Sequence, residues 1–149
     1  ARTIAQWPFG GEKHTPPHSG VQTFFVRFHL SGRKYPPING HDLRIGQIIT
    51  NLIENARSFV SQDGGRIVVH LVRQKDRCIV RVEDNGPGIA EDMLPRLFEP
   101  FATNRVTGTG LGLAIAQNAI RSHRGEITAQ NKPEGGALFV VALPSMANF

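Results

Sequence analysis

Two periods of hydrophobic and polar residues alternate along this chain, and each predicts a different kind of element. Residues 21–30 are rich in valine and phenylalanine, which is typical of a strand. From Asp42 onward, apolar residues recur every three or four positions, which predicts an amphipathic helix of about 19 residues ending near Val60. The turn-forming segment 61–65, Ser-Gln-Asp-Gly-Gly, is expected to end that helix.

The rest of the chain repeats this change of period. Two β-branched runs, 67–73 and 78–84, predict a hairpin. A second amphipathic pattern predicts a helix over 111–123. Two further runs, 126–130 and 138–143, predict a closing strand pair. A short helix is expected over residues 90–98. The order strand, helix, two strands, loop, helix, two strands fits an α/β two-layer sandwich with the helices on one face of a sheet.

Composition limits the number of domains and the compartment. The chain has 149 residues, 40% of them hydrophobic, which suits one domain and is too little for two. We expect an irregular, proline- and glycine-rich arm over residues 1–20 and one domain over residues 21–149. The single cysteine, Cys78, excludes an intrachain disulfide and favours a reducing compartment. The absence of a long apolar run and of an initiator methionine predicts a soluble portion of a longer protein.

The charge predicts acidic partners. The net charge is +5 and the sequence pI is about 10.1, so nucleic acid and phosphorylated small molecules are both candidates. Aromatic residues make up only 7% of the chain, and lysine and arginine are scattered along it. We therefore expect a phosphorylated small molecule rather than nucleic acid.

One face of the predicted 42–60 helix carries a polar stripe. Asn51, Glu54, Asn55 and Ser58 are spaced 0, 3, 4 and 7, so they share a face. Asparagine is a poor helix former, and two in mid-helix need a reason. Their oxygens suit a hard cation such as Mg²⁺, whereas the alternative is an ordinary solvated face.

Asp84 ends the predicted strand 78–84 on its apolar side, because alternate residues of a strand face the same way. A buried carboxylate needs donors, and an amino-bearing base such as adenine supplies one. Gly86 and Gly88 remove side chains where a flat ligand can approach. The alternative is a carboxylate that caps an Asp-Asn-Gly turn.

Three glycines, Gly108, Gly110 and Gly112, lead into the second predicted helix. Bare N–H groups at a helix N-terminus favour phosphate. The spacing matches neither a dinucleotide fingerprint nor a Walker motif, and a flexible hinge is the alternative.

Taken together, these motifs resemble the catalytic ATP-binding domain of two-component sensor histidine kinases, in the superfamily that also holds the DNA gyrase and Hsp90 ATPases. The resemblance covers residues 21–144 and follows the family's order of N, G1, F and G2 boxes and closing strand: 42–56, 83–89, 97–101, 108–114 and 139–144. It implies the Bergerat fold, a mixed and mostly antiparallel sheet, with ATP and Mg²⁺ as cofactors.

The resemblance also implies roles for single residues. Asp84 accepts from the adenine amino group, in a pocket that Gly86 and Gly88 shape. Asn51 and Asn55 hold Mg²⁺ and phosphate oxygens. The catalytic residues implied are Glu54 and Asn55, with Glu54 polarising the incoming imidazole or orienting the metal shell.

A lid over residues 99–109 is implied as well. Phe98 and Phe101 anchor its base, and Arg105 within it reaches the γ-phosphate. The remaining ATP-site residues implied lie in the G2 box: Thr109, Gly110, Leu111 and Gly112. Of these, Gly110 and Gly112 present N–H groups to the phosphates. The side chains of Leu111 and Leu113 are expected to pack under the helix.

The reaction implied is phosphoryl transfer to a histidine. Asn51 stands where the superfamily's ATPases carry a glutamate, and an amide cannot take a proton from water. The acceptor belongs on a separate dimerisation domain. His41-Asp-Leu-Arg44 imitates the acceptor motif only in part, and a place near the helix N-cap is expected for His41. His29 and His70 are expected at the surface and His123 near a helix C-terminus.

The whole protein implied is a membrane-anchored homodimeric sensor that passes phosphate to a response regulator, with this domain in the cytoplasm. Ser58 replaces a lysine, and Ala137 a threonine or serine, that family members carry. These departures leave open a non-catalytic ATP-binding switch or interaction module. An ATPase clamp and a basic nucleic-acid module are further alternatives.

Overall fold

The computed structural model describes residues 23–31, 42–61, 63–74, 76–103 and 109–144. The described elements, in chain order, are β1 (Thr23–Ser31), α1 (Asp42–Arg57), β2 (Asp63–Gln74), β3 (Arg77–Asp84), the 3₁₀ turn η1 (Leu94–Arg96), α2 (Gly112–Ser122), β4 (Glu126–Asn131) and β5 (Ala137–Pro144). The expected arm over 1–20 lies outside the described residues, as do residues 32–41.

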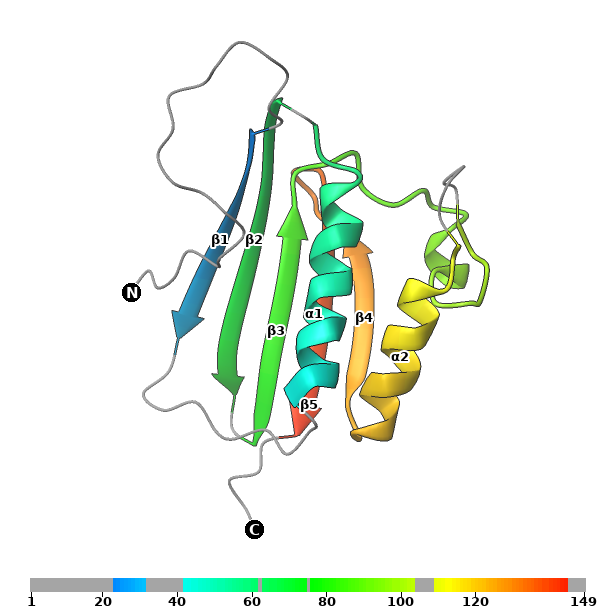
Figure 1. Ribbon diagram of the computed structural model, residues 1–149. Coiled ribbons are helices and arrows are strands. Elements are labelled where there is room, and N and C mark those ends of the chain that lie inside the picture. Colours follow the sequence, from blue (N-terminus) through cyan, green and yellow to red (C-terminus); the bar gives the residue numbers. More distant parts are fainter. Residues whose placement is uncertain (1–22, 32–41, 62, 75, 104–108, 145–149) are drawn as a thin grey trace.

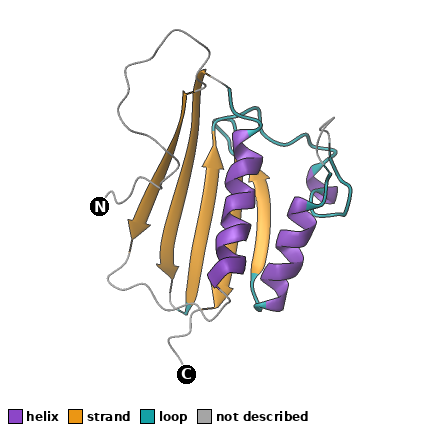
Figure 2. Ribbon diagram, in the orientation of Figure 1, coloured by secondary structure: helices purple, strands orange, loops and turns teal. Residues whose placement is uncertain are grey.

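The five described strands form one sheet in the order β1-β2-β3-β5-β4. β1 pairs with β2 in parallel, and the other three pairs are antiparallel. Figures 1 and 2 show α1 and α2 side by side on one face of the sheet. The predicted two-layer α/β sandwich with a mixed, mostly antiparallel sheet is therefore confirmed.

The core lies between the two helices and the sheet. Leu52 of α1 and Ile120 of α2 are fully buried, as are Ile67 and Phe139 on the facing strands. In β3 every second residue is buried, from Cys78 through Val80 and Val82 to Asp84. This alternation, expected of a strand with one face on a core, turns the Asp84 carboxyl toward the helices.

Two element boundaries differ from expectation. α1 ends at Arg57 rather than Val60. Beyond it the Ser58 N–H is shared between the carbonyls of Glu54 and Asn55, the Phe59 N–H bonds to a carbonyl three residues back, and the Ser58 hydroxyl donates to Asn55 O at 2.6 Å. The helix expected over 90–98 is reduced to the turn Leu94–Arg96, whose central proline lacks an N–H donor.

One end of the molecule collects the segments that carry the candidate chemistry. In Figure 1 the carboxyl ends of β3 and β4, the C-terminal end of α1 and the N-terminal end of α2 all lie at the upper end. The antiparallel pairing of β3 and β4 with β5 brings the start of β5 to the same end. The site is built there.

Candidate functional site

Asp84 is the one buried charged residue in the described part of the chain, with 5% of its surface exposed. Its Oδ1 accepts hydrogen bonds from the backbone N–H of Gly86 at 2.9 Å and of Ala137 at 3.2 Å. These two donors offset the cost of burying a carboxylate. The predicted inward orientation of Asp84 is confirmed, and its donors come from two different segments.

The second carboxylate oxygen of Asp84 is available to a ligand. Oδ2 makes no hydrogen bond with any described residue, and no buried side-chain oxygen of the described residues lacks a partner. Oδ2 is therefore in contact with solvent. A half-satisfied carboxylate on a rigid strand end can accept one N–H bond from a bound molecule.

The protein's own packing restricts the space for a side chain at the glycines after Asp84. A Cβ at Gly86 would lie 3.1 Å from both Asp84 Oδ1 and Phe59 O. Gly88 has a φ of +83°, and a Cβ there would lie 2.7 Å from Asn131 Oδ1. Gly88 thus disfavours any side chain for internal reasons, Gly86 leaves only a tight space for one, and the pocket-shaping role expected of both stays a prediction.

The polar residues of α1 lie beside the stripe that packs on the sheet. Asn51 and Asn55 are half-buried, one helical turn apart, while Glu54 is exposed. The Glu54 carboxylate lies 3.3 Å from the Arg57 guanidinium, which directs Arg57 along the helix. Ser58 lies beyond the helix end and bonds to the backbone, so it does not extend this face.

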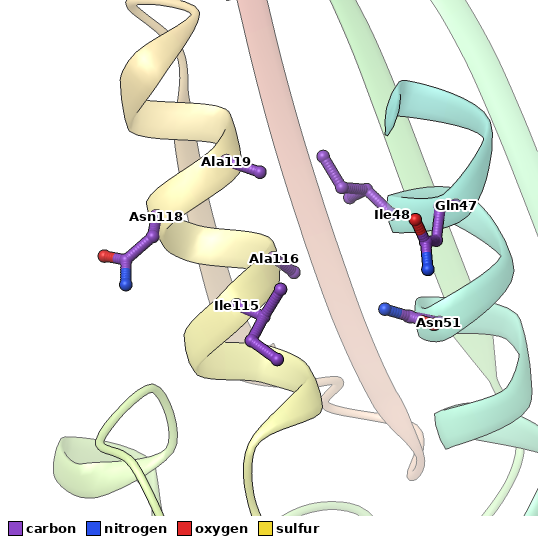
Figure 3. A pocket seen from close by; sticks show the side chains of 7 residues that line it. All are labelled: Gln47, Ile48, Asn51, Ile115, Ala116, Asn118 and Ala119. Carbon is purple, nitrogen blue, oxygen red and sulfur yellow. The ribbon is translucent and has the colours of Figure 1, made fainter. Parts of the chain in front are cut away.

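A pocket of about 390 Å³ lies between α1 and α2. Figure 3 shows Gln47 and Asn51 on α1 turned toward Ile115 and Ala116 on α2. Asp84 does not line this pocket. Of the two asparagines, only Asn51 lines it.

The N-terminus of α2 carries backbone donors without side-chain caps. Leu111 is the N-cap residue, is half-buried and caps no N–H group with its side chain. Its own N–H lies 3.4 Å from Thr109 Oγ1, and Gly112, the first helical residue, is exposed with open space around it. A helix start with free donors and no acidic residue in its first turn attracts anions.

The segment expected to form the lid is closed at its base by backbone. Phe101 N–H donates to Gly110 O at 2.9 Å, and a Cβ at Gly110 would lie 2.6 Å from the Phe101 carbonyl carbon. Phe98 packs against the core, as expected of an anchor. Phe101 is 73% exposed, so the two ends of this segment are joined by the Phe101 backbone and not by its ring. Arg105 lies outside the described residues.

The oxygen donors on α1 suit a metal ion that is held mainly by the phosphate oxygens of a bound molecule. Among the described residues there is no cluster of three or more His, Cys, Asp or Glu side chains able to hold a metal ion. The candidate metal ligands on α1 are the amide oxygens of Asn51 and Asn55. Mg²⁺ accepts such a set, because it keeps waters and shares phosphate oxygens rather than requiring an all-protein cage.

The histidines are dispersed over the molecule. His123 is the C-cap of α2, with Nδ1 2.7 Å from Ala119 O, which agrees with the expected place at a helix C-terminus. His70 is half-buried on β2, its Nε2 3.7 Å from Glu83 Oε1, rather than fully at the surface. The placement of the His29 side chain and of His41 falls outside the described residues.

Sequence reasoning missed three residues that shape this end. Asn85 accepts from Arg66 N–H at 2.7 Å and donates to Gly64 O at 3.1 Å, which prolongs the β2–β3 pairing. Asn131 and Lys132 contact the segment after β3, as described below. No local pattern marks these roles, because each partner lies far away in the sequence.

The chain matches a known family over most of its length. The model of the family described as "Histidine kinase-, DNA gyrase B-, and HSP90-like ATPase" matches residues 40–147. The sensor protein ChvG of Agrobacterium fabrum is 52% identical over an alignment of 138 positions that covers 85% of this chain and 21% of ChvG. The signal transduction histidine-protein kinase AfsQ2 of Streptomyces coelicolor is 44% identical over 68% of this chain and 19% of its own length. The chain thus spans about one fifth of these relatives.

Solved structures agree with these relatives. The nucleotide-free catalytic domain of the histidine kinase ThkA aligns with a TM-score of 0.72 and 28% identity, covering 82% of this chain and 79% of that one. Full-length ShkA in complex with AMPPNP aligns with a TM-score of 0.72 and 28% identity, over 83% of this chain and 26% of ShkA. In the part of the chain that the structure describes, no helix is long and apolar enough to cross a membrane. This chain belongs to the histidine kinase-, DNA gyrase B- and HSP90-like ATPase family and corresponds to the ATP-binding catalytic domain of sensor histidine kinases.

Proposed function

We propose that this domain binds ATP with Mg²⁺ and transfers the γ-phosphoryl group to a histidine on a separate dimerisation domain. The observation that carries the proposal is Asp84, buried at a strand end with Oδ1 satisfied by two backbone N–H groups and Oδ2 open. Asn51 and Asn55 belong to the C-terminal half of α1, and the C-terminal end of α1 and the uncapped N-terminus of α2 lie at the same end of the fold.

Asp84 selects the base. Oδ2 accepts a hydrogen bond from the exocyclic amino group of adenine. Guanine carries a carbonyl oxygen at the corresponding position, which would meet the carboxylate as a second acceptor. Because a bound base shields Oδ2 from water, a base that faces it with an acceptor would leave this oxygen without a donor, and Oδ2 therefore favours adenine over guanine.

Asn51 and Asn55 hold the metal and phosphate end. Their amide oxygens, one turn apart on α1, supply protein ligands to Mg²⁺. The bound ion supplies neutralisation of phosphate charge. The first-turn N–H groups of α2, with Gly110, Leu111 and Gly112 leading into them, donate to phosphate oxygens. We assign three residues of the proposed lid to the ATP site as well: Phe101, Arg105 and Thr109.

The residue pattern favours transfer to a protein side chain over hydrolysis. Asn51 cannot act as a general base for water, because an amide takes no proton at neutral pH. We assign Glu54 the role of polarising the incoming imidazole. Its carboxylate lies on the exposed side of α1, 3.3 Å from the Arg57 guanidinium.

The rest of the protein supplies the other functions. Because the chain spans about one fifth of its curated relatives, we assign the acceptor histidine, dimerisation and a membrane anchor to segments outside it. The phosphoryl group then passes to a response regulator, and this domain works on the cytoplasmic side of the membrane.

Calorimetric titration with a non-hydrolysable ATP analogue and Mg²⁺ tests the binding step. The wild type is expected to bind saturably, and Asp84→Asn to bind at least about tenfold more weakly, because the amide turns a donor or a weaker acceptor toward adenine. Asp92→Asn, an exposed carboxylate on the following turn, is the matched control. Equal binding by wild type and Asp84→Asn would place the base elsewhere.

The transfer step is tested with γ-labelled ATP and a separate histidine-bearing helical domain added in trans. The expected result is label on the added domain, lost in Asn55→Ala, with little phosphate release when the acceptor is absent. Fast turnover without an acceptor would instead support an ATPase clamp. Binding without transfer would support a nucleotide-driven switch.

A further inference from the structure

Asn131, at the end of β4, holds the backbone of Ile89 with two hydrogen bonds. Ile89 N–H donates to Asn131 Oδ1 at 2.6 Å, and Asn131 Nδ2 donates to Ile89 O at 2.7 Å. The side-chain amide thus offers one donor and one acceptor to a single residue, as a neighbouring strand does in an antiparallel ladder. Ile89 lies past the end of β3 and packs on the core.

Gly88 makes room for this contact. It has a φ of +83°, and a Cβ at that position would lie 2.7 Å from Asn131 Oδ1. A side chain at residue 88 would therefore displace the Asn131 amide from Ile89. The glycine and the asparagine act as one unit although 43 positions separate them in the sequence.

Lys132 holds the other end of the same segment. Its Nζ donates to the backbone oxygen of Asp84 at 3.1 Å, and its side chain is only 15% exposed. Two carboxylates balance its charge, Glu83 at 3.7 Å and Glu134 at 3.6 Å. The register between β3 and β5 ends at Glu83 and Leu138, so Lys132 contacts the Asp84 peptide one residue beyond that ladder.

We propose that Asn131 and Lys132 are positioning residues for the nucleotide base. They hold the two ends of the segment 84–89, one at the Asp84 peptide and one at the Ile89 peptide, so that Asp84 Oδ2 is presented before the ligand arrives. A segment ordered in advance loses less conformational freedom on binding, which raises affinity without any contact to the ligand. This inference rests on the proposed binding of ATP at Asp84.

Titration of Asn131→Ala and Lys132→Met with a non-hydrolysable ATP analogue and with ADP tests the proposal. We expect the affinity to fall about tenfold for Asn131→Ala, and by the same factor for both ligands, because the lost bonds lie on the base side. Gln130→Ala is the matched control, since it is an exposed neighbour on the same strand with no hydrogen bond to the 84–89 segment. Lys132→Met keeps the buried stem and removes only the charged donor.

The variant Asn131→Asp gives a readout that a purely structural role would leave unchanged. A protonated carboxyl donates to Ile89 O and accepts from Ile89 N–H, as the amide does, whereas a carboxylate faces Ile89 O with a second acceptor. We expect the affinity of this variant, divided by that of the wild type, to be low near pH 8 and to rise only as the pH falls toward about 4, where an ordinary aspartic acid takes up its proton. Amide exchange at Ile89 is expected to follow the same pH course.

The outcomes separate the two proposals. Circular dichroism first shows that both variants are folded. If Asn131→Ala and Lys132→Met then bind the analogue as tightly as the wild type does, the positioning role is wrong. A ratio for Asn131→Asp that does not change with pH contradicts it independently. If the wild type itself binds neither the analogue nor ADP, the proposed function is wrong and this role falls with it.

Discussion

The backbone N–H of Ala137 donates to Oδ1 of Asp84 at 3.2 Å, joining the first residue of β5 to the last residue of β3. The contact forms where the Asn131–Gly136 turn brings β5 back alongside β3. At residue 137 the family resemblance leads one to expect a threonine or serine hydroxyl near the base. Here the residue is alanine, and its main-chain N–H is the donor to Asp84. Asp84 therefore has a role in the free protein as well as toward a ligand.

That role predicts different stabilities for two substitutions of Asp84. Asp84→Ala leaves the N–H groups of Gly86 and Ala137 without an acceptor and is expected to lower the free energy of unfolding by about 2–4 kcal/mol. Asp84→Asn retains an oxygen for both donors and is expected to cost less than about 1 kcal/mol. Urea unfolding of both variants measures the difference. Equal losses would mean that the two N–H groups find water instead.

The turn before β5 predicts unequal effects at two adjacent glycines. Gly135 and Gly136 both have positive φ, +99° and +87°, so alanine at either is strained by about 1–2 kcal/mol. A Cβ at Gly135 meets nothing, whereas one at Gly136 would press on the Asp84 peptide, 2.8 Å from its carbonyl carbon. Gly136→Ala is therefore expected to be the more destabilising by at least about 1 kcal/mol in urea unfolding. Gly135→Ala is its internal control, and equal losses would contradict the close packing.

Two helical glycines separate stability from ligand binding. A Cβ at Gly46 in α1 or at Gly112 in α2 meets no atom within 4 Å. Alanine at either position is expected to raise the free energy of unfolding by about 0.5–1 kcal/mol, because it reduces the freedom of the unfolded chain. Only Gly112→Ala, which adds a methyl group at the proposed phosphate end, is expected to weaken nucleotide binding. Thermal unfolding and titration measure the two effects, and an equal affinity in both variants would remove Gly112 from the proposed site.

The thiol of Cys78 predicts a loss of stability in alkali. Cys78 is 4% exposed, and burial raises the pKa of its thiol above the ordinary value. Above about pH 8.5 the unfolded chain loses the thiol proton while the folded chain retains it, so the stabilisation present at neutral pH declines as pH rises. The unfolding free energy of the wild type is expected to fall more steeply between about pH 7.5 and 9.5 than that of Cys78→Ala. Parallel pH curves would contradict this, and slow reaction of the native thiol with a disulfide reagent is the accompanying check.

Local pattern accounts for much of what was predicted. The inward orientation of Asp84 follows from the two-residue period of β3, and the polar face of Asn51 and Asn55 follows from the helical period of α1. Both are properties of consecutive residues. The end of α1 at Arg57 was missed, because a few competing hydrogen bonds around Ser58 decide it and the apolar period continues past it.

Most elements, their order, the buried carboxylate and the family to which the motifs belong could therefore be predicted from the order of residues alone, whereas the helix expected over 90–98 was wrong. Which residues support that carboxylate depends on the tertiary fold. The partners Asp84 and Ala137, Ile89 and Asn131, and Lys132 and Asp84 lie 53, 42 and 48 residues apart. Hydrogen bonds act over about 3 Å, and no period along the chain encodes which distant segments come within that range. The sheet order β3-β5-β4 sets those neighbours, because it returns the turn after β4 to the end of β3.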